Sequence, residues 1–118
     1  MRTYTDLVPT FPDQEDWTVA TVLRHHAGER PDAIFLDLPE EKLTFTYAET
    51  LAQAESVADR LAEAGAQTGD RVLVMAANSS QFLRTWLGTG VGGTVEVPIN
   101  TAYEGVFYTL SLHDALPI

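Results

Sequence analysis

Residues 71–76 (RVLVMA) constrain the fold more than any other part of this sequence, because after Arg71 they are apolar on both faces of a strand. A strand with one wet face alternates apolar and polar residues, whereas a parallel strand covered by helices on both faces reads as a continuous apolar run. Gly69-Asp70 turns the chain into this run. We therefore expect a central strand in a layered α/β sheet.

The segment before this strand carries the clearest helix signal. Thr46 and Glu49 match the T-x-x-E capping box, in which the Thr hydroxyl accepts from the N3 amide and the Glu carboxylate accepts from the cap amide. Apolar residues then recur at spacings of three and four, and Gly65 can supply a left-handed C-cap. This pattern predicts a helix over residues 47–64.

Two further elements are expected before this helix. The apolar spacing that begins at Thr18, ended by Gly28 and Pro31, predicts a first helix. The β-prone residues 33–38 and 43–45 are separated by a short polar connection, so they predict an antiparallel hairpin.

After the central strand the pattern predicts one more helix and one more strand. Asn78 can cap a helix that turns Phe82 and Trp86 toward the core. Gly92-Gly93 ends that helix, and residues 94–97 form a short strand before a proline. Helices and strands in this order favour a parallel sheet with helices packed on it.

Composition limits the functional classes. The chain has 118 residues, 45% of them hydrophobic and 20% charged, which is typical of one small globular α/β domain. Its net charge of −10 provides no basic stripe for a nucleic-acid backbone, and the absence of cysteine excludes disulfides and thiol-based sites. No apolar stretch approaches a membrane span and no secretory signal is recognisable, so we expect a cytoplasmic location. The sequence carries no signal for an oligomeric state.

Residues 88–93 (GTGVGG) satisfy the G-x-G-x-x-G dinucleotide fingerprint, with Asp114 at the distance of a ribose-binding acid. That fingerprint needs a strand before it and a helix after it, so that the pyrophosphate meets a helix N-terminus. Here the glycines end a predicted helix and precede a predicted strand. We therefore reject a dinucleotide site.

Two pairs of adjacent residues carry side chains that serve as metal ligands or nucleophiles in other proteins. His25-His26 lack an acid or cysteine spaced to complete a metal site, so solvated histidines near a helix end are the better interpretation. Ser79-Ser80 lack the G-x-S-x-G elbow of a serine nucleophile and are interpreted as first-turn helix residues. We accordingly assign no catalytic, cofactor-binding or metal-binding residue.

Three segments, in order, resemble the amino-terminal region of the acyl-CoA synthetases of the adenylate-forming superfamily. Residues 43–50 (LTFTYAET) resemble its strand and "T-Y-x-E/Q-L" entry into a long helix. Residues 65–72 (GAQTGDRV) resemble its "G-x-x-x-G-D-R-V" turn, and residues 77–82 (ANSSQF) follow where it has "N-S-x-E-F". Residues 97–103 (VPINTAY) match its "V-P-I-N-T-A-Y". The resemblance is nearest to crotonobetaine/carnitine-CoA ligase-like members and covers about residues 17–107.

This resemblance implies the opening portion of the large N-terminal domain of that fold, over residues 17–108, after an extended lead-in at 1–16. The parent enzyme would use ATP, Mg²⁺ and coenzyme A to activate a small carboxylic acid. The family's phosphate loop, Mg²⁺-binding acid, ribose aspartate and late catalytic lysine are not recognisable here, so the fragment itself is expected to be inactive. Two alternatives stay open: another adenylate-former, such as a peptide-synthetase adenylation domain or an aryl ligase, and a non-catalytic α/β interaction module.

Two positions depart from the family pattern. Glu104 stands where the ligases usually carry a basic residue, which puts contacts to an anionic group there in doubt. Glu96 replaces the last alanine of the more usual "L-G-A-V-A" and places an acid in a strand expected to be half-buried.

Residues 109–118 (TLSLHDALPI) resemble the translation of a widely used sequencing-library adapter. This resemblance implies that the natural reading frame ends near Phe107 or Tyr108. His113 and Asp114 would then carry no evolved function.

Overall fold

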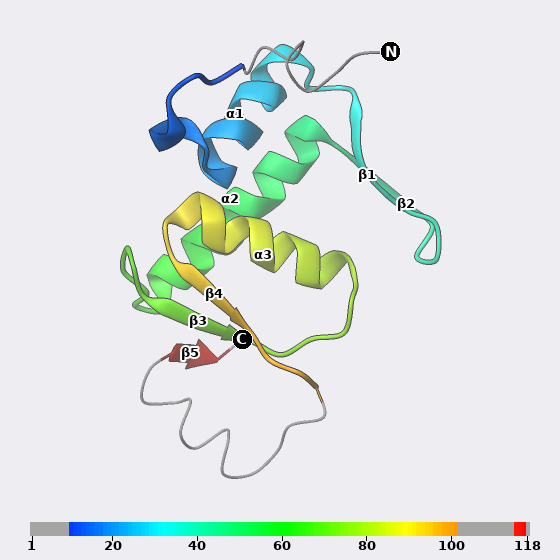
Figure 1. Cartoon of the computed structure of the whole chain (residues 1–118). Helices are drawn as coiled ribbons and strands as arrows, with labels where there is room; N and C mark the ends of the chain where they lie inside the picture. Colours follow the sequence, from blue (N-terminus) through cyan, green and yellow to red (C-terminus); the bar gives the residue numbers. More distant parts are fainter. Residues whose placement is uncertain (1–9, 102–114, 118) are drawn as a thin grey trace.

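Strand β3 (Arg71–Val74) lies between two parallel neighbours, β4 (Val95–Pro98) and β5 (Ala115–Pro117), in a three-stranded sheet. This arrangement was found in a computed structural model that describes residues 10–101 and 115–117 (Figure 1). Val72, Leu73 and Val74 are all buried, as the two-sided apolar pattern predicts. The expectation of a buried strand in a parallel sheet is therefore confirmed by the pairing with β4, while the central place of β3 depends on β5. The strand ends at Val74, and the chain leaves the sheet from Met75 onward.

Helix α2 (Tyr47–Glu63) begins at the predicted capping box. The Thr46 amide donates to Glu49 Oε1 at 2.9 Å, and the Glu49 amide donates to Thr46 Oγ1 at 3.1 Å. The hydrogen bonds from Thr46 lower the pKa of the Glu49 carboxyl, because they stabilise its ionised form. Gly65, just after the helix, adopts the predicted left-handed conformation with φ of 102°.

Helix α1 (Val19–Glu29) and helix α3 (Ser80–Gly92) complete the helical layer above the sheet (Figure 1). One core cluster joins the three helices through Leu23, Ala54 and Leu87. A second joins the end of α2 to the sheet through Leu61, Val72 and Val74. Helices α2 and α3 thus cover one face of the sheet through apolar side chains, and α1 packs on these two helices.

The glycines of residues 88–93 serve helix packing. A Cβ on Gly88 would lie 2.5 Å from Val57 Cβ, and Cβ atoms on Gly90 and Gly92 would lie 3.0 Å from Val19 Cβ and Ala58 Cβ. Only the absence of side chains lets α3 approach its neighbours this closely. Gly93 ends the helix with φ of 78°, so the rejection of a dinucleotide fingerprint is supported by a packing explanation.

Strands β1 (Ile34–Leu38) and β2 (Leu43–Thr46) form the predicted antiparallel hairpin, with an irregularity between Ile34 and Leu36. The hairpin is a separate two-stranded sheet, not an extension of the β3 sheet. It leads directly into α2, and its turn lies beside the N-terminus of α3 (Figure 1).

Several local expectations need correction. Ser79, not Asn78, caps α3, because its hydroxyl accepts from the Phe82 amide at 3.2 Å. Trp86, expected in the core, is 45% exposed. Residues 14–16 form a 3₁₀ turn, η2 (Gln14–Asp16), within the segment expected to be extended; residues 1–9 lie outside the described part.

Replacing Gly88 tests the close helix contact. Gly88→Ala places a methyl group against Val57 and 3.0 Å from the Ala54 carbonyl oxygen, so we expect a loss of about 1–3 kcal/mol in the free energy of unfolding. Gly28→Ala is the matched control: its Cβ meets no atom within 4 Å, and alanine should stabilise α1 by about 0.5–1 kcal/mol. Urea unfolding followed by circular dichroism measures both. Equal stability of Gly88→Ala and the unchanged chain would contradict the packing explanation.

Candidate functional site

A cavity of about 430 Å³ opens at the carboxyl ends of β3 and β4. In open α/β sheets this is the edge where ligands bind, because the loops that follow parallel strands meet there. The cavity is lined by the connection from β3 to α3, by one side chain of α3, and by the residues that follow β4: Ala76, Ala77, Asn78, Phe82, Pro98, Ile99, Asn100 and Thr101. We call it the strand-end cavity.

Backbone hydrogen bonds fix both walls of the strand-end cavity. The Ser79 hydroxyl donates to the Ala77 carbonyl at 3.1 Å while it caps α3, which fixes the bend before the helix. On the other side, the Ile99 amide donates to the Val74 carbonyl at 2.8 Å. The β4 ladder therefore continues one residue beyond Pro98 and carries Asn100 and Thr101 to the cavity.

The end of the second motif segment and the third motif segment meet at this cavity. Residues 77–82 supply Ala77, Asn78 and Phe82, and the resemblance segment 97–103 supplies the residues after β4. Parallel pairing of β3 with β4 puts both carboxyl ends at one edge, so segments about twenty residues apart become neighbours. Residues 102 and 103 of the second segment lie outside the described part of the chain.

The first motif segment and the beginning of the second, residues 65–72, shape the fold. Residues 43–50 form the hairpin strand and capping box described above. In residues 65–72 the Gln67 amide donates to Asp70 Oδ2 at 2.7 Å, and the Asp70 carbonyl accepts from the Val95 amide at 2.8 Å. This turn therefore ties the start of β3 to the start of β4.

The described residues that line the strand-end cavity lack the charged side chains that bind a nucleoside triphosphate and its metal ion. Its polar lining consists of Asn78, Asn100 and Thr101, with no cationic side chain and no carboxylate among the lining residues. The single lysine of the sequence, Lys42, lies in the hairpin turn. No three His, Asp or Glu side chains within the described ranges gather as a metal site.

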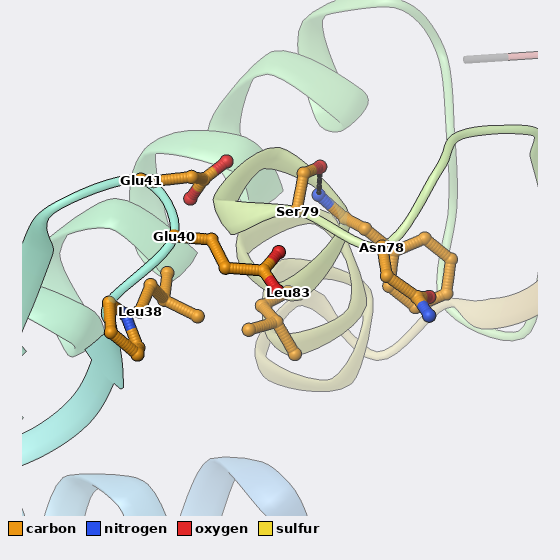
Figure 2. A pocket seen from close by; sticks show the side chains of 8 residues that line it. Leu38, Glu40, Glu41, Asn78, Ser79 and Leu83 are labelled. Carbon is orange, nitrogen blue, oxygen red and sulfur yellow. Dashed lines mark hydrogen bonds between the residues drawn. The ribbon is translucent and has the colours of Figure 1, made fainter.

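A second cavity, of about 350 Å³, lies between the hairpin turn and α3 (Figure 2). We call it the hairpin cavity. Leu38, Pro39, Phe82 and Leu83 give it apolar walls, and Glu40 and Glu41 of the hairpin face Ser79 of α3 across it. Asn78 and Phe82 line both cavities, so the first turn of α3 is the wall between them.

A third hollow, of about 370 Å³, is almost entirely apolar and lies between α1, α3 and β1. Its rim includes Trp17, Phe35 and Trp86, which are 57%, 38% and 45% exposed. The Trp17 ring nitrogen donates to the Phe11 carbonyl at 2.7 Å, which fixes one side of the rim.

The expectation of solvated histidines is wrong. His25 and His26 are half-buried in a row of rings, with His25 edge-on to Phe11 at 5.0 Å and His26 tilted against Tyr47 at 5.7 Å between centroids. Their spacing on α1 gave no sign of this row, because the ring partners come from distant segments.

Glu96 occupies the half-buried position expected for it on β4. Its Oε1 atom is buried without a hydrogen-bond partner, and burial raises the pKa of the carboxyl above its ordinary value of 4.5. Glu104 lies outside the described residues.

A family profile described as "AMP-binding enzyme" matches residues 23–112. The chain belongs to this family. The long-chain-fatty-acid–CoA ligase FadD13 of Mycobacterium tuberculosis is 35% identical over 97 residues, which are 82% of this chain and 19% of that protein. The acyl-CoA ligase sidI of Aspergillus fumigatus is 29% identical over 108 residues, covering 90% of this chain and 18% of that protein. The chain therefore spans about a fifth of the length of these curated relatives.

Solved structures show the same relationship. The inhibitor-bound crystal structure of the N-terminal domain of FACL13 from Mycobacterium tuberculosis superimposes with a TM-score of 0.75 at 29% identity, covering 85% of this chain and 26% of that one. The α/β fold is thus part of the N-terminal domain fold of adenylate-forming ligases, as expected. Within the described ranges, no helix combines the length and the apolar character needed to cross a bilayer.

Neutralising Glu96 should stabilise the chain in a pH-dependent way. A carboxyl whose pKa is raised by folding destabilises the fold when ionised, fully so above the raised pKa and not at all well below 4.5. We expect Glu96→Gln to unfold at a higher urea concentration than the unchanged chain at pH 7, with the difference shrinking as the pH falls toward 4.5. Glu63→Gln, on the exposed face of α2, controls for removing one charge from an acidic chain. A gain that persists unchanged at low pH would contradict the desolvation explanation.

Proposed function

We propose that this chain is part of an ATP-dependent acid-CoA ligase. The parent enzyme would join a carboxylic acid to the AMP part of ATP with release of pyrophosphate, and would then transfer the acyl group to coenzyme A with release of AMP. The observation that carries the proposal is the meeting of residues 77–82 and 97–101 at the strand-end cavity, in a chain of the AMP-binding family. Acyl-CoA and fatty-acid ligases among the relatives support the ligase class.

In this proposal the chain supplies scaffold and the rest of the parent supplies the reacting groups. Adenylate formation develops negative charge at the phosphates, and that charge needs cationic side chains, hydrogen-bond donors and Mg²⁺ aimed at it. The neutral lining of the strand-end cavity offers none of the cations. We therefore propose that ATP, Mg²⁺ and coenzyme A bind the parent enzyme through residues beyond this chain, in the cytoplasm, where ATP and coenzyme A are available.

Within the ligases we propose the crotonobetaine/carnitine-CoA ligase-like subclass for the parent. The match of residues 97–103 to "V-P-I-N-T-A-Y" supports it. The names of the relatives point instead to long-chain fatty acids as the competing substrate class. A panel containing crotonobetaine, carnitine and long-chain acids distinguishes the two.

We also propose that residues 109–118 derive from adapter sequence. Two findings bear on this segment: the family match extends to residue 112, and β5 at 115–117 pairs with Arg71, Val72 and Leu73 of β3. An open edge of β3 would accept any short extended segment, because ladder hydrogen bonds use only backbone groups. A full-length transcript should therefore carry a different sequence after Tyr108; the same ten residues joined to a continuing coding sequence would remove the proposal.

The parent protein provides the decisive test of function. We expect the extended coding sequence to contain a phosphate loop and a late lysine, and the purified product to catalyse acid-dependent exchange of pyrophosphate into ATP, followed by thioester formation with coenzyme A. Exchange without thioester formation would assign another adenylate-former. A continuation that lacks both motifs would defeat the proposal.

The 118-residue chain alone should show no pyrophosphate exchange above background, because the cations that stabilise the transition state are missing from it. The purified parent, assayed in parallel with the same acids, is the positive control. Exchange activity in the isolated chain at a rate comparable with the parent would contradict the scaffold role.

A further inference from the structure

We propose that the β1–β2 hairpin is a strap fastened to α3 by Glu41, and that this contact positions the wall shared by the two cavities. The proposal concerns the conformation of this chain and does not depend on the ligase activity proposed above. It rests on one side-chain contact between residues 39 positions apart in the sequence.

The hairpin turn is built to present Glu41 in one direction. Leu38 pairs with Leu43, and the amides of Glu41 and Lys42 donate to the carbonyls of Leu38 and Pro39 at 3.1 and 3.2 Å. Pro39 has a restricted φ, and Lys42 adopts a left-handed φ of 56°. Two overlapping turns with these residues leave the loop little freedom, so the Glu41 side chain leaves it at a defined place.

Glu41 reaches the N-terminus of α3. Its Oε2 and Oε1 atoms accept from the Ser80 amide at 3.1 and 3.3 Å. Ser80 is the first residue of the helix and is 8% exposed, so its amide has no partner within the helix and little access to water. A carboxylate is also favoured there by the positive end of the helix dipole. The contact therefore satisfies a donor that α3 itself leaves unpaired.

Apolar packing holds the hairpin turn only loosely. The hairpin cavity of about 350 Å³ separates Leu38 and Pro39 from Phe82 and Leu83, so these side chains forgo part of the dispersion attraction that close packing would give. Within the described part of the chain, no other hydrogen bond or ion pair joins the turn at 39–42 to α3. Glu41 therefore makes the polar contact that holds the hairpin turn to α3.

The strap also acts on the strand-end cavity. Ser80 lies between Asn78 and Phe82 in the chain, and these two residues line both cavities. Fixing the Ser80 amide fixes the first turn of α3, and with it the wall that faces the strand ends. Glu41 is accordingly a positioning residue for a cavity that it does not itself line.

Hydrogen exchange of the whole 118-residue chain tests the strap, measured residue by residue with mass spectrometry at micromolar concentration. We expect Glu41→Ala to raise the exchange rate of the Ser80 amide by about tenfold or more, because the amide loses a charged acceptor. Glu40→Ala is the matched control, since Glu40 is the neighbouring acid in the same turn and makes no hydrogen bond to α3. Equal exchange rates in the two variants would overturn the proposal.

Distance measurements test the positioning role separately. The chain has no cysteine, so nitroxide labels at Thr44→Cys and Asp59→Cys report the hairpin position relative to α2 without competing sites. We expect Glu41→Ala to broaden the distance distribution and Glu40→Ala to leave it unchanged. A distribution that Glu41→Ala leaves unchanged would show that other contacts hold the hairpin, and would overturn the strap.

If Glu41→Ala does not fold, the Glu41→Gln variant is used in the hydrogen-exchange test instead. Glutamine retains an oxygen acceptor of the same reach without the charge, so we expect a smaller rise in Ser80 exchange while the amides of α2 keep their protection. Equal loss of protection in α2 and at Ser80 would mean that Glu41 supports global stability only, which would contradict a local strap.

Discussion

The close approach of α3 to α2 is the contact on which the rest of this structure depends. Gly88 lets the two helices meet at Val57 and at the backbone of Ala54, whose side chain is fully buried. This approach sets the height of α3 above the sheet, because Leu61 of α2 and Phe82 of α3 both pack on the face that carries Val72 and Val74. The first turn of α3 consequently lies at the ends of β3 and β4, where it forms one wall of the strand-end cavity.

The elements of the fold could be predicted from sequence because their signals are local. The capping box joins Thr46 to Glu49, three residues away, and the left-handed conformation of Gly65 depends on that residue alone. Both are present in the structure. The errors arose where a distant segment decides the outcome. Trp86 has the spacing of a core residue, but it lies at the edge of a hollow with Trp17 and Phe35. Asn78 and Ser79 are both good caps, and the bend that follows β3 selects Ser79.

The candidate site was only partly visible in the sequence. The motif segments at 77–82 and 97–103 could be recognised singly, but their meeting depends on parallel pairing of the strands that precede them. The Glu41 contact had no sequence signal, since a glutamate in a polar turn is ordinary and its partner is a backbone amide on another element. The ring contacts of His25 and His26 could not be predicted for the same reason. Their partners, Phe11 and Tyr47, are distant in sequence and are brought to α1 by the tertiary fold.

Charge supports the scaffold role proposed for this part of an AMP-binding fold. The chain has a net charge of −10, and its strand-end cavity has polar side chains without a cation among the described lining residues. The nearby N-terminus of α3, where the helix dipole is positive, already receives the Glu41 carboxylate. A triphosphate brought to this edge would therefore meet repulsion from the acidic chain, and the described lining residues include no cationic side chain to offset the cost of removing its charge from water. Binding of such a group at this edge would therefore need cations from outside the described lining residues, which is why the proposed scaffold role leaves the charged groups to the rest of the parent enzyme.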